Sequence, residues 1–491
     1  MAESGAPSGL RRRGQAAAAL TARWPAVSLA MVQHAPILAV LLAPPGLAAA
    51  LEREMLLAIT LLGPALALVA LYYSTRHLTG DYELRRIEAV AILAMLFVLS
   101  TLLAIPAFMS LGMSAIDALF ESASGITSTG LSVAQDAETW PISAHFLRAW
   151  TQWCGGLAIA IAGVALLMDS GRASKVIGNE TVGGADYQAS TRAKARIVLS
   201  IYAAITLFGV IVSIPLFPGW WEGPVIALAA VSTGGFSPRA SSLADYSLLA
   251  QVFTMLLCVA TTVSLLFYAL VWKRGTRIAM SRGTVRTALG ILAVGTVLST
   301  GFAGIRDEWD SATIISTALN HVSAQTTAGF SVAPIPPTSP ILFLFIVAMV
   351  LGGDVGSTTG GMKTGRTTIL AGMVRLVFLR LRLPDRAVSH LKIGEKRADA
   401  EAILFAAALL SIYLFAMMVF WLALFLYGYP PLPSLFDAVS ALSTVGLSSG
   451  VIGPDLEPEL KLLTVAAMLL GRLEFFVLIS LFLPSTWIPR R

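Results

Sequence analysis

Long apolar segments separated by short polar ones make up most of this chain. Ten of them are long enough to cross a membrane, because a transmembrane helix needs about 20 mostly apolar residues. They cover 28–50, 55–74, 87–111, 145–168, 196–217, 246–272, 286–304, 339–372, 401–427 and 460–483. The eighth is too long and too rich in glycine for one regular helix. The pattern predicts an all-α membrane protein with ten spans.

Four shorter apolar segments lie between paired spans and are too short to cross a bilayer. They cover 114–126, 222–232, 311–325 and 432–443. Segments of this length are typical of re-entrant helices. We therefore predict a unit of span, half-helix, hairpin loop and span, present four times after an additional N-terminal helix pair. The predicted division is an N-terminal segment over 1–26, the helix pair over 27–75, and pseudo-symmetric repeats over 76–170, 171–273, 274–373 and 374–491.

A six-residue motif follows each half-helix. In every copy, hydroxyl-bearing residues stand three and two positions before a glycine, and a bulky apolar residue and a serine follow it. The parts that end at the glycine are Thr127, Ser128, Thr129, Gly130; Ser232, Thr233, Gly234, Gly235; Thr326, Thr327, Ala328, Gly329; and Ser443, Thr444, Val445, Gly446. A single copy could be a Gly/Ser/Thr contact between packed helices. Four copies in matched positions indicate a repeat.

The residue types in these motifs suit coordination of a dehydrated cation. A cation that leaves water needs oxygen atoms in place of its hydration shell, and channels supply backbone carbonyls. Glycine lets carbonyls face an axis without a Cβ in the way, and an inward-pointing helix C-terminus adds partial negative charge. No carboxylate lies within the motifs, which fits weak binding of a monovalent cation. We interpret them as four filter segments around one ion pathway.

The third repeat contains a second unusual motif, GGDVGSTTGGMKTGR at 352–366. Non-helical backbone at membrane depth is tolerated where it lines water or is buried in protein. We expect a gating loop just cytoplasmic of the third filter segment, where it could obstruct the pathway. A phosphate-binding loop is the alternative, but the preceding strand and the P-loop spacing are missing. The loop residues assigned to gating are Gly352, Gly353, Asp354, Gly356, Ser357, Thr358, Gly360, Gly361 and Lys363.

Ionisable residues inside predicted spans are functional candidates by default. Arg472 and Glu474 lie in the last span, and Lys363 and Asp354 lie beside the gating loop. We interpret Arg472 and Lys363 as an electrostatic barrier to cations, with an internal ion pair that fixes helix packing as the alternative. Glu474 is expected to be structural. Two polar residues of the half-helices are expected to brace the structure, Glu121 and His321.

Composition supports a membrane protein and argues against other classes. The chain is 56% hydrophobic and 13% charged, with a mean hydropathy of +0.78, whereas soluble domains average about 25% charged residues. Its scattered histidines and two cysteines form no catalytic or metal-binding pattern, so we predict that it is not an enzyme. The net charge of +6 does not indicate nucleic-acid binding, because the basic residues lie in loops between spans.

Charge also predicts the orientation. The connectors between repeats are basic, above all 375–397, whereas Asp136 and Glu138 follow the first filter segment. By the positive-inside rule, the connectors and both termini face the cytoplasm and the filter segments open outward. We therefore predict a multi-pass protein of the cytoplasmic (inner) membrane, embedded in the lipid bilayer. The 375–397 connector could also be a docking surface, or only a topogenic charge cluster.

The four filter segments, the GGDVGSTTGGMK loop and the closing GRLEFF sequence together resemble the Trk/Ktr/HKT superfamily of potassium transporters. The N-terminal helix pair makes the chain most similar to the TrkH type, over about residues 30–485. The resemblance implies K⁺ uptake through a K⁺-channel-like selectivity filter, with K⁺ held at the filter residues and no organic cofactor. It also implies a homodimer and a cytoplasmic, nucleotide-binding regulatory subunit of the TrkA type.

Carried over by residue, the resemblance assigns the filter glycines to Gly130, Gly235, Gly329 and Gly446, and the basic residue of the last span to Arg472. In this family a serine at the first filter glycine accompanies Na⁺ permeation, so Gly130 favours K⁺. Asp354 departs from the small neutral residue expected there, and loop closure could therefore depend on pH or a cation. A Na⁺-permeable member of the family and an ion-coupled secondary transporter of another solute remain alternatives.

Overall fold

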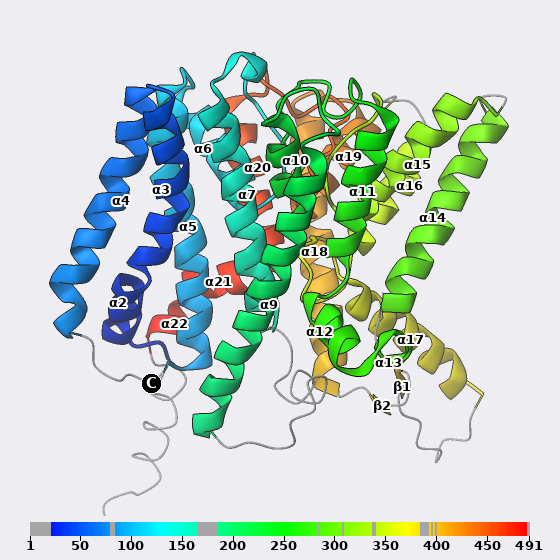
Figure 1. Ribbon diagram of the computed structural model, residues 1–491. Helices are drawn as coiled ribbons and strands as arrows, with labels where there is room; N and C mark the ends of the chain where they lie inside the picture. Colours follow the sequence, from blue (N-terminus) through cyan, green and yellow to red (C-terminus); the bar gives the residue numbers. More distant parts are fainter. Residues whose placement is uncertain are drawn as a thin grey trace, which may run out of the picture.

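The computed structural model describes residues 21–78, 84–164, 184–282, 285–306, 309–335, 340–382, 392–393, 396–397 and 400–488. Helices dominate these residues (Figure 1), and a short antiparallel pairing of β1 (Lys392–Ile393) with β2 (Lys396–Arg397) is the only sheet in them. Six helical segments in these residues, one of them Trp24–Leu51, are long and apolar enough to cross a membrane. The predicted all-α membrane fold is confirmed.

The predicted N-terminal helix pair lies at one side of the molecule, coloured blue in Figure 1. It consists of α2 (Trp24–Gln33), which continues into α3 (Ala35–Leu51), and of α4 (Met55–Thr75), followed by the 3₁₀ turn η1 (Arg76–Leu78). Leu42 of α3 and Leu61 of α4 are fully buried and belong to one apolar cluster with Phe108 of α5 (Arg86–Ser110). Burial of these side chains attaches the pair to the rest of the protein.

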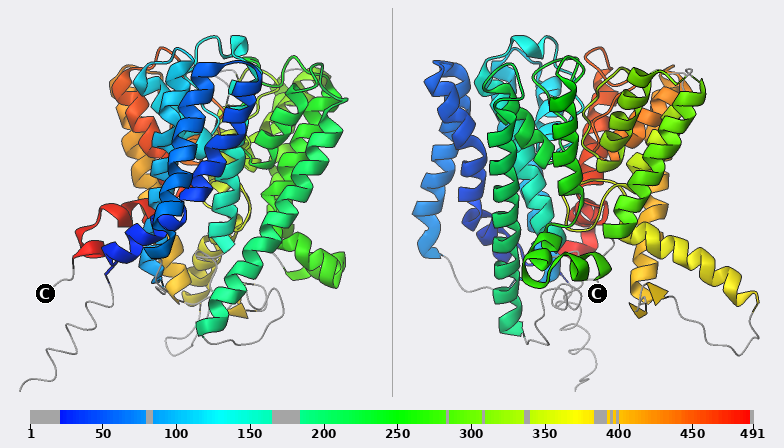
Figure 2. Two further views of the ribbon diagram at one scale, coloured as in Figure 1. Left: turned by 60° about the vertical axis from the view of Figure 1, so that its left-hand side comes forward. Right: turned by 45° about the vertical axis from the view of Figure 1, so that its right-hand side comes forward.

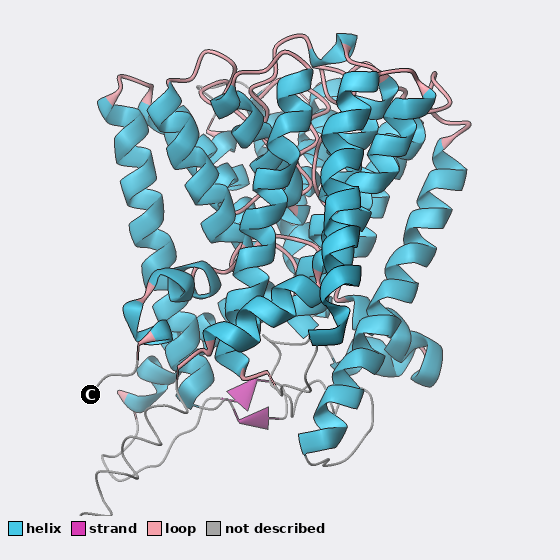
Figure 3. Ribbon diagram, turned by 90° about the vertical axis from the view of Figure 1, so that its left-hand side faces the viewer, coloured by secondary structure: helices cyan, strands magenta, loops and turns pink. Residues whose placement is uncertain are grey.

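A short helix is present at each of the four predicted half-helix positions. These helices are α6 (Ala115–Ile126), α10 (Glu222–Val231), α15 (Ser311–Thr326) and α19 (Pro431–Leu442). Side-chain caps define two of their starts, since Ser114 accepts from the Asp117 amide and Asp310 from the Thr313 amide. Loops gather at the upper edge in Figure 3 and also run inside the helix bundle, where the filter segments follow the half-helices.

Two further helices flank each half-helix in the predicted order. They are α5 and α7 (Ile142–Ala162), α9 (Gly184–Ser213) and α11 (Leu248–Thr262), α14 (Val285–Arg306) and α16 (Ile341–Leu351), and α18 (Ala400–Leu426) and α20 (Pro458–Arg472). The 3₁₀ turn η2 (Ala137–Thr139) follows the first filter segment. The predicted boundary at 170–171 lies outside the described residues, and α17 (Thr364–Arg380) runs across the one at 373–374.

Two of the predicted spans, 246–272 and 460–483, each consist of two helices that meet at a sharp bend. The first consists of α11 and α12 (Leu265–Arg274) at 79°, and the second of α20 and α21 (Phe476–Phe482) at 114°. At the first bend, the Thr262 carbonyl accepts from the Asp354 amide at 3.0 Å and the Leu265 amide donates to Gly356 at 3.1 Å. Backbone groups freed by the bend are therefore satisfied by the loop predicted to act as a gate.

At the second bend, Glu474 and Phe475 have positive φ angles of 52° and 58°. L-residues adopt such angles rarely, so the helix cannot continue through them. If each bent pair counts as one span, the described residues contain up to eight candidate spans. The total of ten stays a prediction.

The lower part of the molecule in Figure 1 contains α12, α13 (Thr276–Arg282), α17, α21 and α22 (Pro484–Trp487). α17 extends away from the bundle, as the right-hand view of Figure 2 shows in yellow. The rings of Trp24 and Trp487 stack with centroids 4.0 Å apart. The first and last described helices therefore lie on the same side of the molecule.

Candidate functional site

The four half-helices end in the same backbone motif. In the first, the Ser128 amide bonds to the Gly125 carbonyl at 3.0 Å and the Thr129 amide to Ser124 at 2.9 Å, and the other three repeat this pair of bonds. Such bonds form the Schellman motif, which needs a left-handed residue after the helix. Here that residue is a hydroxyl-bearing one with φ between 50° and 53°: Ser128, Thr233, Thr327 and Thr444.

The glycines of the filter segments form a closed ring. Their φ angles are 91°, 80°, 76° and 101° for Gly130, Gly235, Gly329 and Gly446. A Cβ added to any of them would lie 2.1–2.6 Å from the carbonyl oxygen before the next glycine, in the order Gly234, Ala328, Val445 and Thr129. The fourth segment therefore contacts the first, and this contact closes the ring. The structure brings all four predicted segments together, and only glycine fits at the joints.

The first hydroxyl of each segment is used inside the protein. Thr127 donates to the Ala123 carbonyl at 2.6 Å, Ser232 to Ala229 at 2.9 Å and Thr326 to Val322 at 2.7 Å. Ser443 is 2.8 Å from the buried Tyr413 hydroxyl. These hydroxyls therefore brace the ends of the half-helices.

The predicted gating loop lies directly against the left-handed hydroxyl residues of three segments. Thr358 is 3.4 Å from the Thr233 hydroxyl. The Gly360 amide donates to the Thr327 hydroxyl at 2.7 Å, and a Cβ on Gly360 would collide with the Ser443 carbonyl and with Thr444. The loop therefore covers one face of the filter ring, and Gly360 allows its closest approach.

Arg472 links the first filter segment to the loop. Its guanidinium, at 2% exposure, donates to the Thr358 carbonyl at 2.8 Å and to the Ser128 hydroxyl at 3.3 Å. Both acceptors are neutral oxygens, and Glu474 pairs with Arg366 instead, so Arg472 and Glu474 do not form the internal ion pair considered as the alternative. The arginine charge lies at the first filter segment and the loop.

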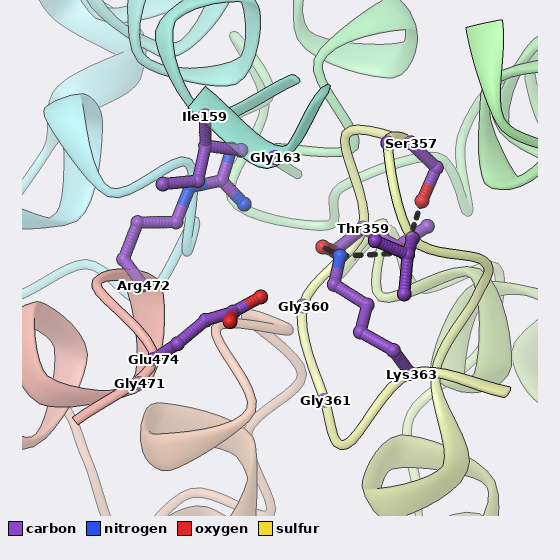
Figure 4. Close-up of a pocket in the computed structure, with 12 residues that line it drawn as sticks. Ile159, Gly163, Ser357, Thr359, Gly360, Gly361, Lys363, Gly471, Arg472 and Glu474 are labelled. Atoms are coloured by element: carbon purple, nitrogen blue, oxygen red, sulfur yellow. Dashed lines mark hydrogen bonds between the residues drawn. The ribbon is translucent and has the colours of Figure 1, made fainter. Parts of the chain in front are cut away.

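Lys363, Glu474 and Arg472 line a cavity of about 20 Å³ beside the loop (Figure 4), which has room for about one water molecule. Lys363 donates to the Thr359 carbonyl, and Figure 4 shows its side chain lying along the loop. Glu474 pairs with Arg366 at 2.5 Å, in agreement with its predicted structural role. Sequence reasoning missed Arg366, although the rule that singled out Lys363 applies equally to it.

Asp354 shapes the start of the loop. Its carboxylate accepts from the Val355 amide at 2.8 Å, and its carbonyl accepts from the Ser357 hydroxyl at 2.5 Å. Within the described ranges, no group of three or more His, Cys, Asp and Glu side chains is arranged to hold a metal ion. The oxygens at the ring of filter glycines are backbone carbonyls, which suit a weakly held monovalent cation.

This architecture defines a multi-pass membrane transport protein. The family model named TrkH, described as "Cation transport protein", matches residues 65–300 and 292–488. The chain therefore belongs to the TrkH family, whose members are transport proteins and not enzymes.

Curated relatives and a solved structure agree with this assignment. The chain is 29% identical to the "Trk system potassium uptake protein TrkH" of Halomonas elongata, over 85% of this chain and 89% of that protein. It is also 29% identical to the protein of the same name from Escherichia coli K12, over 76% and 79%. The crystal structure of the potassium transporter TrkH from Vibrio parahaemolyticus matches with a TM-score of 0.80 at 21% identity, over 92% of this chain and 97% of that one. That likeness shows the fold.

Proposed function

We propose that this protein takes up K⁺ across the cytoplasmic membrane through the ring of four filter segments. The closed ring of glycines and neighbouring carbonyls carries the proposal, because it is the arrangement that can replace the hydration shell of a cation. The names of the Halomonas and Escherichia relatives support K⁺ as the ion. The K⁺-binding residues are then the sixteen of the predicted filter segments.

The gating loop and Arg472 form the obstruction below the filter in this proposal. The loop contacts the second, third and fourth segments and Arg472 contacts the first, so a cation that leaves the ring meets backbone and a positive charge. Uncompensated positive charge in a low-dielectric surrounding repels a cation strongly. Movement of the loop together with Arg472 is what opens the pathway.

The surroundings of the protein follow from the charge pattern and from the family. The filter opens outward and both termini face the cytoplasm, in keeping with the basic connectors. A homodimer and a cytoplasmic nucleotide-binding subunit of the TrkA type complete the transport system, as the phrase "Trk system" in the relatives' names suggests. The most basic connector, 375–397, lies partly outside the described residues and is the proposed docking surface.

Growth rescue tests the proposal. The gene is expressed in a bacterium that lacks K⁺ uptake systems, and growth at limiting K⁺ is measured together with Rb⁺ and Na⁺ flux. We expect growth and Rb⁺ uptake in excess of Na⁺ uptake, and a reduced Rb⁺/Na⁺ ratio for Gly130→Ser and Gly329→Ser. Rescue without Rb⁺ preference would identify a Na⁺-permeable protein. Uptake that requires another solute would identify a secondary transporter.

A further inference from the structure

One filter segment lacks the support that the other three receive from their own half-helix. Nine residues before the filter glycine, three half-helices carry a polar side chain, and the second carries Ile226. These polar residues hold the outer part of their own segment: Glu121 accepts from Ser132 at 3.0 Å, Asn320 from the Val332 amide at 2.9 Å, and Asp437 from Ser448 at 2.8 Å. Ile226 can make no such bond.

Gln152 of α7, a helix of the first repeat, supplies the missing support. Its side chain is fully buried, and its Nε2 donates to the Gly234 carbonyl at 2.5 Å. Its Oε1 accepts from the Phe236 amide at 3.3 Å. The two bonds lie on either side of Gly235, so the side-chain amide of Gln152 fixes the backbone on both sides of the second filter glycine.

Arg148, one helical turn earlier on α7, connects the first and second segments. It pairs with Glu121 at 2.8 Å and donates to the Ser237 carbonyl at 3.2 Å. Its guanidinium also lies 4.0 Å from the centre of the Phe236 ring. Glu121 in turn accepts a hydrogen bond from Ser132 of the first segment. Arg148 therefore links the outer ends of the first and second segments through charge-assisted bonds.

We propose that Gln152 and Arg148 are positioning residues that fix the second filter segment and thereby set cation discrimination. The inference rests on the proposed function. The Gly234 carbonyl that Gln152 holds is the one that faces Gly130 in the ring. Without the Gln152 amide, the Gly234 carbonyl and the Phe236 amide lose this buried partner, which is unfavourable for the segment in its present position. The second filter segment then shifts, and the distance between Gly130 and the Gly234 carbonyl oxygen changes.

The test compares Rb⁺ and Na⁺ flux of the reconstituted full-length protein, at equal amounts of folded protein. Gln152→Leu is expected to reduce the Rb⁺/Na⁺ flux ratio by about tenfold, which corresponds to about 1.4 kcal/mol. The control is Thr206→Val, which removes the hydroxyl that accepts from the Trp153 indole at 2.9 Å. Trp153 is the neighbour of Gln152 on α7, so the control deletes a bond of the same helix away from the filter.

Two further variants separate positioning from a merely structural role. Adding Ile226→Asn to Gln152→Leu places an amide where the third half-helix carries Asn320, and should recover part of the ratio. Arg148→Lys keeps the charge beside Glu121 but loses the planar fork of donors, and should lower the ratio without preventing folding. If wild-type protein is selective and both Gln152→Leu and Arg148→Lys keep its ratio, the inference is wrong. If wild-type protein itself shows no Rb⁺ preference, the proposed function fails instead.

Discussion

Gly130 offers the sharpest test of the filter ring, because the same chain contains a matched control. Both Gly130 and Gly112 have a φ of 91°. A Cβ on Gly130 would lie 2.1 Å from the Gly234 carbonyl oxygen, whereas a Cβ on Gly112 would have no atom within 4 Å. Substitution by alanine therefore imposes the same left-handed φ at both positions, but only Gly130→Ala pushes against a neighbouring filter segment.

The expected loss of Rb⁺/Na⁺ discrimination follows from the cost of the left-handed φ and the cost of the close contact. A left-handed φ costs an L-residue about 1–2 kcal/mol, and both variants bear this cost. In Gly130→Ala the contact must also open by about 1 Å to reach the 3.0 Å below which real Cβ atoms essentially never approach. Overpacking of this kind typically costs about 1–3 kcal/mol. If that strain is relieved by widening the ring, discrimination between Rb⁺ and Na⁺ should fall by about five- to 150-fold.

The assay measures Rb⁺ and Na⁺ flux into proteoliposomes, with the amount of folded protein determined by size-exclusion chromatography. We expect a reduced Rb⁺/Na⁺ ratio for Gly130→Ala and the wild-type ratio for Gly112→Ala. Equal ratios in both variants and the wild type would refute the reasoning that the joint between Gly130 and Gly234 belongs to the selective part of the pathway.

Three further predictions concern the loop and the charges below the ring. Gly360→Ala should raise Rb⁺ flux, because its Cβ would collide with the Ser443 carbonyl and displace the loop; lower flux with normal folding would argue against a gate. Arg472→Gln should also raise flux by removing a buried positive charge, and unchanged flux would contradict the proposed barrier. Arg366→Met leaves the Glu474 carboxylate unpaired and should lower the free energy of unfolding by about 3–5 kcal/mol. The double variant that also carries Glu474→Leu should recover most of the lost free energy of unfolding, as measured by thermal unfolding. A double variant no more stable than Arg366→Met would argue against a stabilising ion pair between Arg366 and Glu474.

Much of the architecture could be predicted because it depends on local properties of the sequence. The half-helices are recognisable from their length, which is too short to cross a bilayer. The gating loop is recognisable from its glycines, which do not favour a regular helix. The sequence also indicates which residues form the filter segments, since a glycine that follows two hydroxyl residues recurs after every half-helix.

The bends in two spans could not be predicted, because they depend on partners far away in the sequence. Thr262 and Leu265 belong to an uninterrupted apolar segment, and their backbone groups turn away from the helix to bond Asp354 and Gly356 of the loop. Hydropathy does not report such bonds. The order of the segments around the ring also emerges only when the four half-helices pack together.

Gln152 and Arg148 were missed for a different reason. Both lie in a predicted span, and an arginine at that depth is itself a functional signal. Their role depends on Ile226, whose apolar side chain leaves the second segment without a bond from its own half-helix. That absence becomes meaningful only after the four half-helices have been compared position by position.

The most direct test of the central claim is to locate the ion. A crystal structure of the protein in RbCl, with anomalous data collected at the Rb⁺ absorption edge, would show where a K⁺ analogue binds. We predict anomalous density on the axis enclosed by Gly130, Gly235, Gly329 and Gly446, within coordination distance of carbonyls from all four filter segments. Well-ordered density for the ring with no Rb⁺ on its axis, or Rb⁺ bound elsewhere in the membrane region, would contradict the account.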